Sequence, residues 1–307
     1  MGQKSDLSGV VAMMAGTASF VVGDSFMKLV IEDLPPFEVL FLRGIAASLA
    51  CAVLVVWRGE QRAMSGALNP HALLRAAGET LSVLCYIVAL SRLPLADAIA
   101  ILQTAPLILT LAAALLLREK IGPLRVGFVL LGFVGALMIS QPGAAGVSSA
   151  ALFAFASALL IAARDFVGRN VPTRIPVTVV ALATTIMVMS AAGALSSAVE
   201  TWTPPSGRHL AFLGAAGLFV TLGHAGLLLA YRLGRTATIA PFFYSFALWG
   251  VLAGWIVWRA LPNPIALAGI ALIAVSGVAL VLLDQRRSRR ATAYTKALTP
   301  AANPWPD

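Results

Sequence analysis

Several charged side chains of this sequence stand inside long apolar stretches, where a lipid environment makes an unpaired charge costly. Asp24 and Lys28 are four residues apart, and Asp165 and Arg169 repeat that spacing 141 residues later. Side chains at i and i+4 share one face of a helix, so we expect each acid to pair with its basic neighbour. Two interpretations stay open. The pairs either stabilise the fold as neutralised ion pairs, or act as gates whose charges exchange partners during a conformational change.

A stripe of polar side chains on another apolar stretch could contact a small molecule. Glu79, Ser82 and Tyr86 follow one another at i, i+3 and i+7 and therefore share a helix face. His224 lies near the centre of a later stretch, and an imidazole titrates near neutrality, which makes this residue a candidate proton carrier. The alternative is a histidine that only packs against its neighbours.

Two prolines mark places where a membrane helix is expected to break. Pro106 and Pro241 lie inside or near the ends of their stretches, where the missing N–H kinks a helix or leaves a carbonyl facing a cavity. Gln103 precedes the first proline, and Tyr244 and Trp249 follow the second. We expect Gln103 and the freed backbone groups to bind the polar end of a substrate, and the two aromatic rings to bind its apolar part. A kink that only improves packing is the alternative.

The remaining polar residues give no indication of catalysis. The sequence shows no nucleophile with a base, no clustered metal ligands and no glycine-rich phosphate loop, and Cys51 and Cys85 lie inside apolar stretches without metal-ligand spacing. We therefore expect no enzymatic activity, no metal and no cofactor. Arg43 lies only a turn or two into its stretch, so we expect it to extend to the outer membrane interface.

The elements that position these residues are membrane-spanning helices. Of the 307 residues, 59% are hydrophobic and 11% are charged, against about 25% charged in soluble domains. A span needs roughly 20 mostly apolar residues. Ten such segments are predicted, at 8–31, 37–57, 72–91, 95–117, 122–140, 147–168, 175–198, 209–231, 236–258 and 264–283.

The basic residues are distributed unevenly between the two sides of these spans. With the N-terminus in the cytoplasm, sixteen Lys and Arg fall on the cytoplasmic side, three on the other side and three within spans. This bias predicts a multi-pass protein of the bacterial inner membrane with both termini in the cytoplasm. It also accounts for the net charge of +9 without nucleic-acid binding. We expect the basic tail, 286–307, to contact lipid headgroups and to be largely disordered.

The second half of the chain repeats the first. Arg92-Leu93 corresponds to Arg232-Leu233, in addition to the repeated charge spacing. Five spans per half make 1–143 and 144–285 two repeats that enter the membrane from opposite sides. We therefore predict an all-α membrane protein of ten helices in two inverted repeats around a central cavity, the architecture of alternating-access transporters. Glycine spacings at 127–135 and 269–277 predict close packing of helices five and ten.

Several motifs of the first repeat resemble the EamA-type branch of the drug/metabolite transporter superfamily. They are Ala105-Pro106, the sequence Leu116-Leu117-Arg118-Glu119-Lys120, and the glycines from Gly127 to Gly135. The second repeat diverges, with Arg259 near the position of Glu119. The resemblance implies a cavity lined by helices one, three, four, six, eight and nine, and export of small metabolites, amino acids or drugs. The chain is most similar to aromatic-amino-acid exporters.

These observations predict an exporter of aromatic or large neutral amino acids. Its buried cations stand mostly beside acids, which favours a zwitterionic or neutral substrate over an anionic one. A multidrug or other metabolite exporter of the same fold is the first alternative. A channel and a polytopic enzyme acting on lipids are alternatives of other classes. The expected partners are the substrate and membrane lipids, and the sequence leaves the oligomeric state open.

Overall fold

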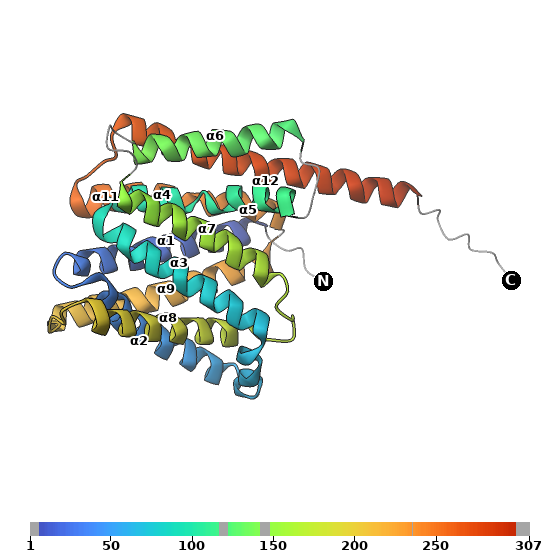
Figure 1. The fold of residues 1–307 in the computed structure, drawn as a ribbon. Helices are drawn as coiled ribbons and strands as arrows, with labels where there is room; N and C mark the ends of the chain where they lie inside the picture. Colours follow the sequence, from blue (N-terminus) through green and yellow to red (C-terminus); the bar gives the residue numbers. More distant parts are fainter. Residues whose placement is uncertain (1–5, 117–121, 142–147, 235, 299–307) are drawn as a thin grey trace.

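The structure, a computed structural model, describes residues 6–116, 122–141, 148–234 and 236–298. These residues form helices and short connections without strands (Figure 1). Ten helical segments within them are long and apolar enough to cross a membrane. The predicted all-α architecture of ten spans is therefore confirmed.

The two repeats contain corresponding helices. The first consists of α1 (Asp6–Ile31), α2 (Pro36–Trp57), the 3₁₀ helix η1 (Gln61–Leu68), α3 (Pro70–Arg92), α4 (Leu95–Leu102), α5 (Ala105–Leu116) and α6 (Pro123–Ser140). The second consists of α7 (Ser149–Gly168), α8 (Val177–Val199), α9 (Gly207–Leu233), α10 (Thr236–Ile239), the 3₁₀ helix η2 (Ala240–Tyr244), α11 (Ser245–Trp258) and α12 (Pro264–Leu298). Spans four and nine are both interrupted, the fourth between α4 and α5 and the ninth at η2, as the two prolines predict.

Helix boundaries follow local sequence signals. Pro36, Pro70 and Pro123 occupy the first turn of their helices, where the missing N–H has no helical acceptor to lose. Asn69 caps α3 by accepting from the His71 amide at 3.0 Å. These signals set where each span begins. Because the spans are largely apolar, their sequences specify only weakly which side of each helix points inward.

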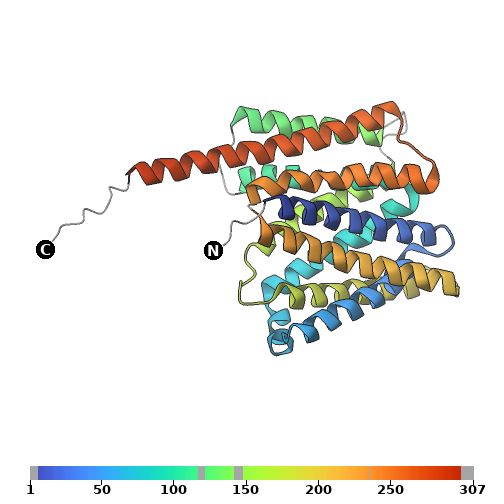
Figure 2. The same cartoon turned by 180° about the vertical axis from the view of Figure 1, so that it is seen from behind.

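The largest interfaces join the two repeats. α1 packs on α9, α3 on α7, α2 on α8 and α6 on α12. Successive contacts close a ring in the order α1, α9, α2, α8, α3, α7, α4, α11. Exchanging each helix of the ring for its counterpart in the other repeat leaves the same set of contacts, which is the pseudo-twofold relation of an inverted repeat. α6 and α12 lie side by side at the edge of this ring (Figures 1 and 2).

Close packing of α6 on α12 depends on glycine, as the sequence predicts. A Cβ atom built on Gly135 would lie 2.7 Å from the carbonyl oxygen of Gly269, and one built on Gly269 would lie 2.5 Å from that of Gly135. Any side chain at either position would push the two backbones apart. This reciprocal contact makes the outer pair a rigid unit.

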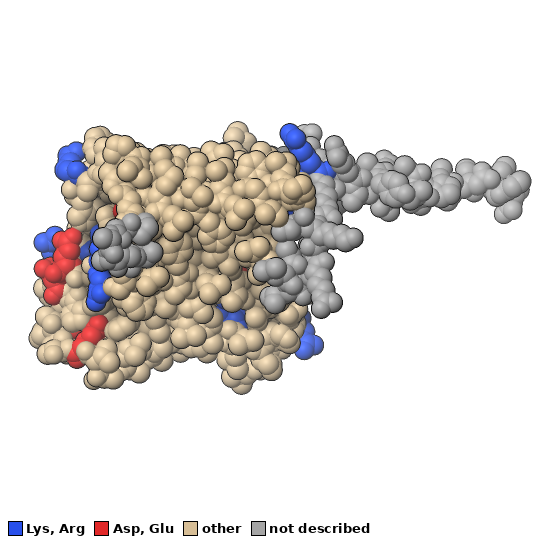
Figure 3. All heavy atoms as spheres, turned by 45° about the horizontal axis from the view of Figure 1, so that its top comes forward, with Lys and Arg blue, Asp and Glu red and all other residues tan. Residues whose placement is uncertain are grey.

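The surface fits a bilayer environment. Charged side chains gather at the two ends of the bundle, and the band between them is almost free of charge on the face shown in Figure 3. The start of α1 and the end of α12 lie at the same end, together with the α2–α3 and α7–α8 connections (Figure 1). We call this end the terminal end and the other the distal end.

The tail differs from the prediction. α12 continues through the basic segment to Leu298, because its Arg, Gln, Ala and Lys residues are good helix formers. The prediction of disorder from residue 286 is therefore wrong up to Leu298, while 299–307 lie outside the described residues. The predicted repeat boundary at 143–144 also lies outside them.

Candidate functional site

A cavity of about 480 Å³ lies between α2, α3, α8 and α9. The α7–α8 connection forms part of its wall. It draws on the N-terminal halves of α3 and α8 and on the C-terminal half of α9, and these segments all lie toward the terminal end. The cavity therefore belongs to that half of the bundle.

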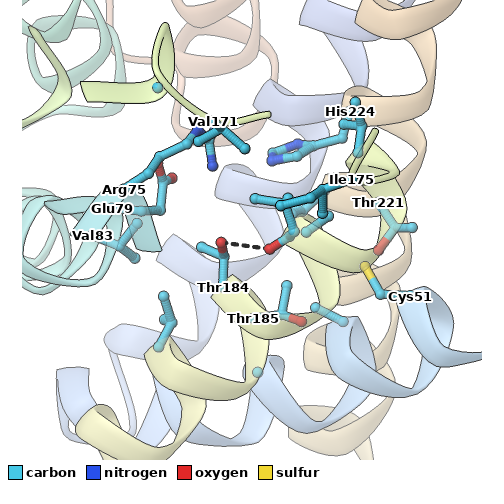
Figure 4. Close-up of a pocket in the computed structure, with 18 of the residues that line it drawn as sticks. Cys51, Arg75, Glu79, Val83, Val171, Ile175, Thr184, Thr185, Thr221 and His224 are labelled. Atoms are coloured by element: carbon cyan, nitrogen blue, oxygen red, sulfur yellow. Dashed lines mark hydrogen bonds between the residues drawn. The ribbon is translucent and has the colours of Figure 1, made fainter. Parts of the chain in front are cut away.

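Polar side chains converge on the cavity from several helices (Figure 4). Arg75 and Glu79 of α3 face it from one side, and His224 of α9 points into it from the other. Thr184 and Thr185 of α8 add hydroxyl groups between these two walls. The apolar part of the wall is largely valine. Its valines are Val83, Val171, Val177, Val180, Val188 and Val220.

Arg43 also lines this cavity, which corrects the prediction that it extends to the outer interface. Its side chain is buried, with 9% of the residue exposed. The lipid-facing side of α2 carries Ile45, Leu49 and Val53, so Arg43 lies on the opposite, inward side with Ala47 and Cys51. Its Nε atom has no hydrogen-bond partner among the described residues. A buried guanidinium that lines a cavity is suited to bind a carboxylate.

Glu79 is held by an arginine from the other repeat. Its carboxylate forms an ion pair with Arg164 of α7, and Arg164 Nε also lies 3.0 Å from Asp165 Oδ1. The predicted pair of Asp165 with Arg169 is therefore replaced by a pair with Arg164, while the Arg169 guanidinium lies 5.8 Å from the Phe166 ring centroid. The Glu79–Arg164 contact joins α3 to α7 behind the cavity wall.

The predicted local pair of Asp24 with Lys28 is also not formed. Tyr86 donates its hydroxyl to Asp24 Oδ2 at 2.9 Å, and Lys28 Nζ donates to the carbonyls of Leu90 and Leu93 at 2.8 and 2.7 Å. The physical reason is that the C-terminus of α3 presents carbonyls without helical partners, which attract a cation. Asp24 and Lys28 therefore bind α3 instead of each other.

The structure places two of the predicted substrate-binding residues, Glu79 and His224, at this cavity. Tyr86 is buried against Asp24. Ser82 lies 2.9 Å from Ser157 Oγ, a contact that packs α3 on α7. Tyr244 belongs to the buried cluster beside α12. These three do not line the cavity in this conformation.

Gln103 and Trp249, the other two predicted residues, are also absent from the cavity wall. Gln103 lies at the break between α4 and α5 and is 2% exposed, and neither amide atom has a partner among the described residues. The Trp249 indole nitrogen has none either. Both residues lie at or just after an interrupted span, Gln103 at the end of α4 and Trp249 in α11.

Sequence reasoning missed Arg43, Arg75, Thr184 and Thr185 as cavity residues. The i, i+4 spacing of Arg75 and Glu79 was a signal that could have extended the predicted polar stripe by one turn. The threonines carried no such signal, since threonine is common in membrane helices. Among the described residues, no group of His, Cys, Asp and Glu could hold a metal ion.

Comparison with known proteins agrees with this architecture. Residues 7–141 match the EamA-like transporter family. A riboflavin transporter of Rhizobium johnstonii is 32% identical over 223 residues, which cover 71% of this chain and 72% of that protein. A pseudopaline exporter of Pseudomonas aeruginosa is 27% identical over 285 residues, 89% of this chain and 95% of the other.

A solved crystal structure shares the fold. It superposes with a TM-score of 0.64 over 90% of this chain and 98% of its own, at 20% sequence identity. The ten spans, the inverted repeats, the cavity between them and these relatives agree. The chain belongs to the EamA-like transporter family, within the drug/metabolite transporter superfamily, and is a multi-pass membrane transporter.

Proposed function

We propose that this protein is an alternating-access exporter of small amphipathic metabolites that carry a carboxylate, with aromatic and large neutral amino acids as the leading class. The observation that supports this most is Arg43, a buried cation that lines the cavity. A guanidinium in a low-dielectric cavity binds a carboxylate through two parallel hydrogen bonds when the geometry allows.

The charges around the cavity favour an acidic group on the substrate. Arg43 and Arg75 line it together with a single acid, Glu79, whose carboxylate is paired with Arg164. The lining charge is thus positive overall. The sequence suggested instead that the buried cations stand mostly beside acids. A zwitterion with an exposed carboxylate is compatible with either distribution of charge.

The size and apolar lining of the cavity suit a substrate with a hydrophobic part. A volume of about 480 Å³ lies within the range of roughly 300–1,000 Å³ that small-molecule pockets occupy. The valines from α3, α8 and α9 provide apolar contact, while Thr184 and Thr185 offer hydroxyl groups. A large aliphatic or aromatic side chain can lie against these valines while its carboxylate reaches Arg43.

Export requires loading from the cytoplasm, and the position of the cavity fits this direction. It lies toward the terminal end, which the distribution of basic residues predicts to be cytoplasmic. In the opposite state, the interrupted spans would bring Gln103, Tyr244 and Trp249 to the substrate. Tyr86 and Ser82 belong to the same proposed path, and His224 is the proposed proton carrier.

The test is counterflow of labelled phenylalanine in proteoliposomes, comparing Arg43→Gln with Arg43→Lys. Loss of a buried charge pair costs about 2–5 kcal/mol, so Arg43→Gln is expected to weaken the apparent affinity roughly thirtyfold or more. Arg43→Lys should retain part of it. Arg208→Gln, an exposed position at the distal end, is the matched control.

A substrate-side comparison makes this experiment specific. Phenylethylamine has the same ring as phenylalanine but no carboxylate, so Arg43→Gln should leave its inhibition constant unchanged. Equal affinity of unmodified protein and Arg43→Gln for phenylalanine, with normal expression, would show that Arg43 does not bind the carboxylate.

A flavin is the second candidate substrate, favoured by the 32% identity to a riboflavin transporter. Riboflavin carries no carboxylate, so its transport would not depend on the Arg43 charge. Uptake of labelled riboflavin and of labelled phenylalanine, measured in the same proteoliposome preparation, separates the two candidates. Uptake of riboflavin alone, unaffected by Arg43→Gln, would replace the amino-acid proposal.

A further inference from the structure

A second hollow, of about 240 Å³, lies between α2, α8 and α9 at the terminal end. We call it the α2–α9 groove. Its walls are mainly apolar, with Leu54 and Trp57 of α2 facing Leu228 and Leu229 of α9. Trp57 is 78% exposed, and Leu229 is also an exposed large hydrophobic residue. In a membrane these exposed side chains contact lipid tails, so the groove is accessible from the bilayer.

Two arginines stand where the groove reaches the end of the bundle. Arg58 directly follows α2, and Arg232 lies in the last turn of α9. Arg58 Nη1 is 4.0 Å from Glu60 Oε1, at the limit of an ion pair, and Arg58 and Arg232 both line the groove. Both lie on the face predicted to be cytoplasmic, at the depth where α2 and α9 leave the membrane.

We propose that the α2–α9 groove binds an anionic phospholipid, with one acyl chain between α2 and α9 and the phosphate between Arg58 and Arg232. The apolar walls match an acyl chain, and the two cations match the charge of the headgroup. A basic pocket between membrane helices on the cytoplasmic side is a typical place for such a lipid.

The bound lipid would act on the transport cavity through a shared wall. Cys51, Thr221 and His224 line both hollows. An acyl chain in the groove therefore supports the cavity wall formed by α2 and α9 from the outside. This inference goes beyond the proposed substrate and holds whichever metabolite is transported.

The test is native mass spectrometry of the purified full-length protein, equilibrated with equimolar phosphatidylglycerol and phosphatidylcholine of identical chains. Unmodified protein is expected to retain phosphatidylglycerol preferentially. Each arginine near an anionic headgroup contributes about 1 kcal/mol, so Arg58→Gln/Arg232→Gln should lower that preference roughly tenfold or more. Arg62→Gln/Arg174→Gln removes the same charge at the same end, outside the groove, and should keep the preference.

A second variant tests the acyl-chain part without changing charge. Ala225 lines the groove, and Ala225→Phe would fill its apolar part and lower retention of both lipids. Melting curves identify any variant that does not fold. If the Arg58/Arg232 variant does not fold, Ala225→Phe still tests the proposal. Equal retention of the two lipids by unmodified protein, or an unchanged preference in the Arg58/Arg232 variant, would overturn the proposal. Unchanged retention in Ala225→Phe would do the same.

Discussion

The two ends of the α2–α8 pair are held together differently. At the distal end, Glu200 of the second repeat accepts hydrogen bonds from the Phe37 and Glu38 amides at 2.9 and 3.0 Å. Glu38 in turn accepts from the Thr203 amide at 2.9 Å and is fully buried. At the terminal end, Thr178 donates to Glu60 beside the cavity, where Glu60 is only partly buried. Three hydrogen bonds to two carboxylates, one of them on the buried Glu38, join the distal end, whereas Thr178 at the terminal end binds the partly buried Glu60. We therefore expect the terminal end to part more easily.

Other contacts at the distal end also cross between the repeats. His209 Nε2 lies 3.1 Å from Asp33 Oδ2, and Trp258 donates to Glu32 at 2.8 Å. These bonds join the α1–α2 connection to helices of the second repeat. Inverted symmetry implies that the alternate state breaks such contacts and closes the terminal end instead. On the proposed export cycle, the distal end is therefore the one that must open for release.

Removing the Glu200 carboxylate should have the largest effect on this comparison. Glu200→Ala deprives the N-terminus of α2 of its acceptors, which typically costs about 0.5–2 kcal/mol for a helix cap. That shifts the balance toward a distal-open state by roughly tenfold. Spin labels at Thr201 and Leu261, both exposed at the distal end, should show a new long-distance population by pulsed electron resonance.

The matched control for this experiment is Ser197→Ala. Ser197 is exposed on the same helix and donates to the Ala194 carbonyl of that helix. It should leave the distance distribution unchanged. If Glu200→Ala also leaves it unchanged, the distal bonds do not hold that end closed.

A double-mutant cycle tests the contact of α1 with α3, where Asp24 binds Tyr86 and not Lys28. Asp24→Asn and Tyr86→Phe should couple by about 0.5–3 kcal/mol, because they remove two partners of one bond. Asp24→Asn and Lys28→Gln should add within about 0.5 kcal/mol. Thermal unfolding in detergent measures both. Strong coupling of Asp24 to Lys28 would restore the local ion pair that the spacing suggested.

The smallest effect is expected at the terminal end. Thr178→Ala removes the bond to Glu60 at a partly exposed position, where water replaces the lost donor. A hydrogen bond in such a place contributes about 0.5–1.5 kcal/mol at most. Spin-label distances at the distal end and counterflow should both stay near those of the unmodified protein. A shift as large as that of Glu200→Ala would show that the two ends are held equally.

The sequence predicted those parts of the fold that depend on local signals. Runs of apolar residues gave the spans, Pro106 and Pro241 gave the interrupted helices, and the glycines near Gly135 and Gly269 gave the close outer pair. Each of these features acts within one or two turns of helix. The odd number of spans per repeat then implied the inverted arrangement.

The site was harder to predict because it depends on helix rotation and on partners far apart in sequence. α2 is apolar nearly all round, so its pattern does not show that Arg43 faces inward. The i, i+4 rule paired Asp24 with Lys28, but the free carbonyls at the end of α3 compete for the lysine. Glu79 likewise finds Arg164 across the repeat boundary, a partner that only the packing of α3 on α7 brings near.

In the proposed export cycle, the cavity is open to the cytoplasm in this conformation and closed at the distal end. A single cysteine at Thr184, with Cys51 and Cys85 replaced by alanine, tests it in membrane vesicles of known orientation. A membrane-impermeant maleimide should label this cysteine rapidly in inside-out vesicles and slowly in right-side-out vesicles. Equal labelling in both, or faster labelling in right-side-out vesicles, would contradict the account.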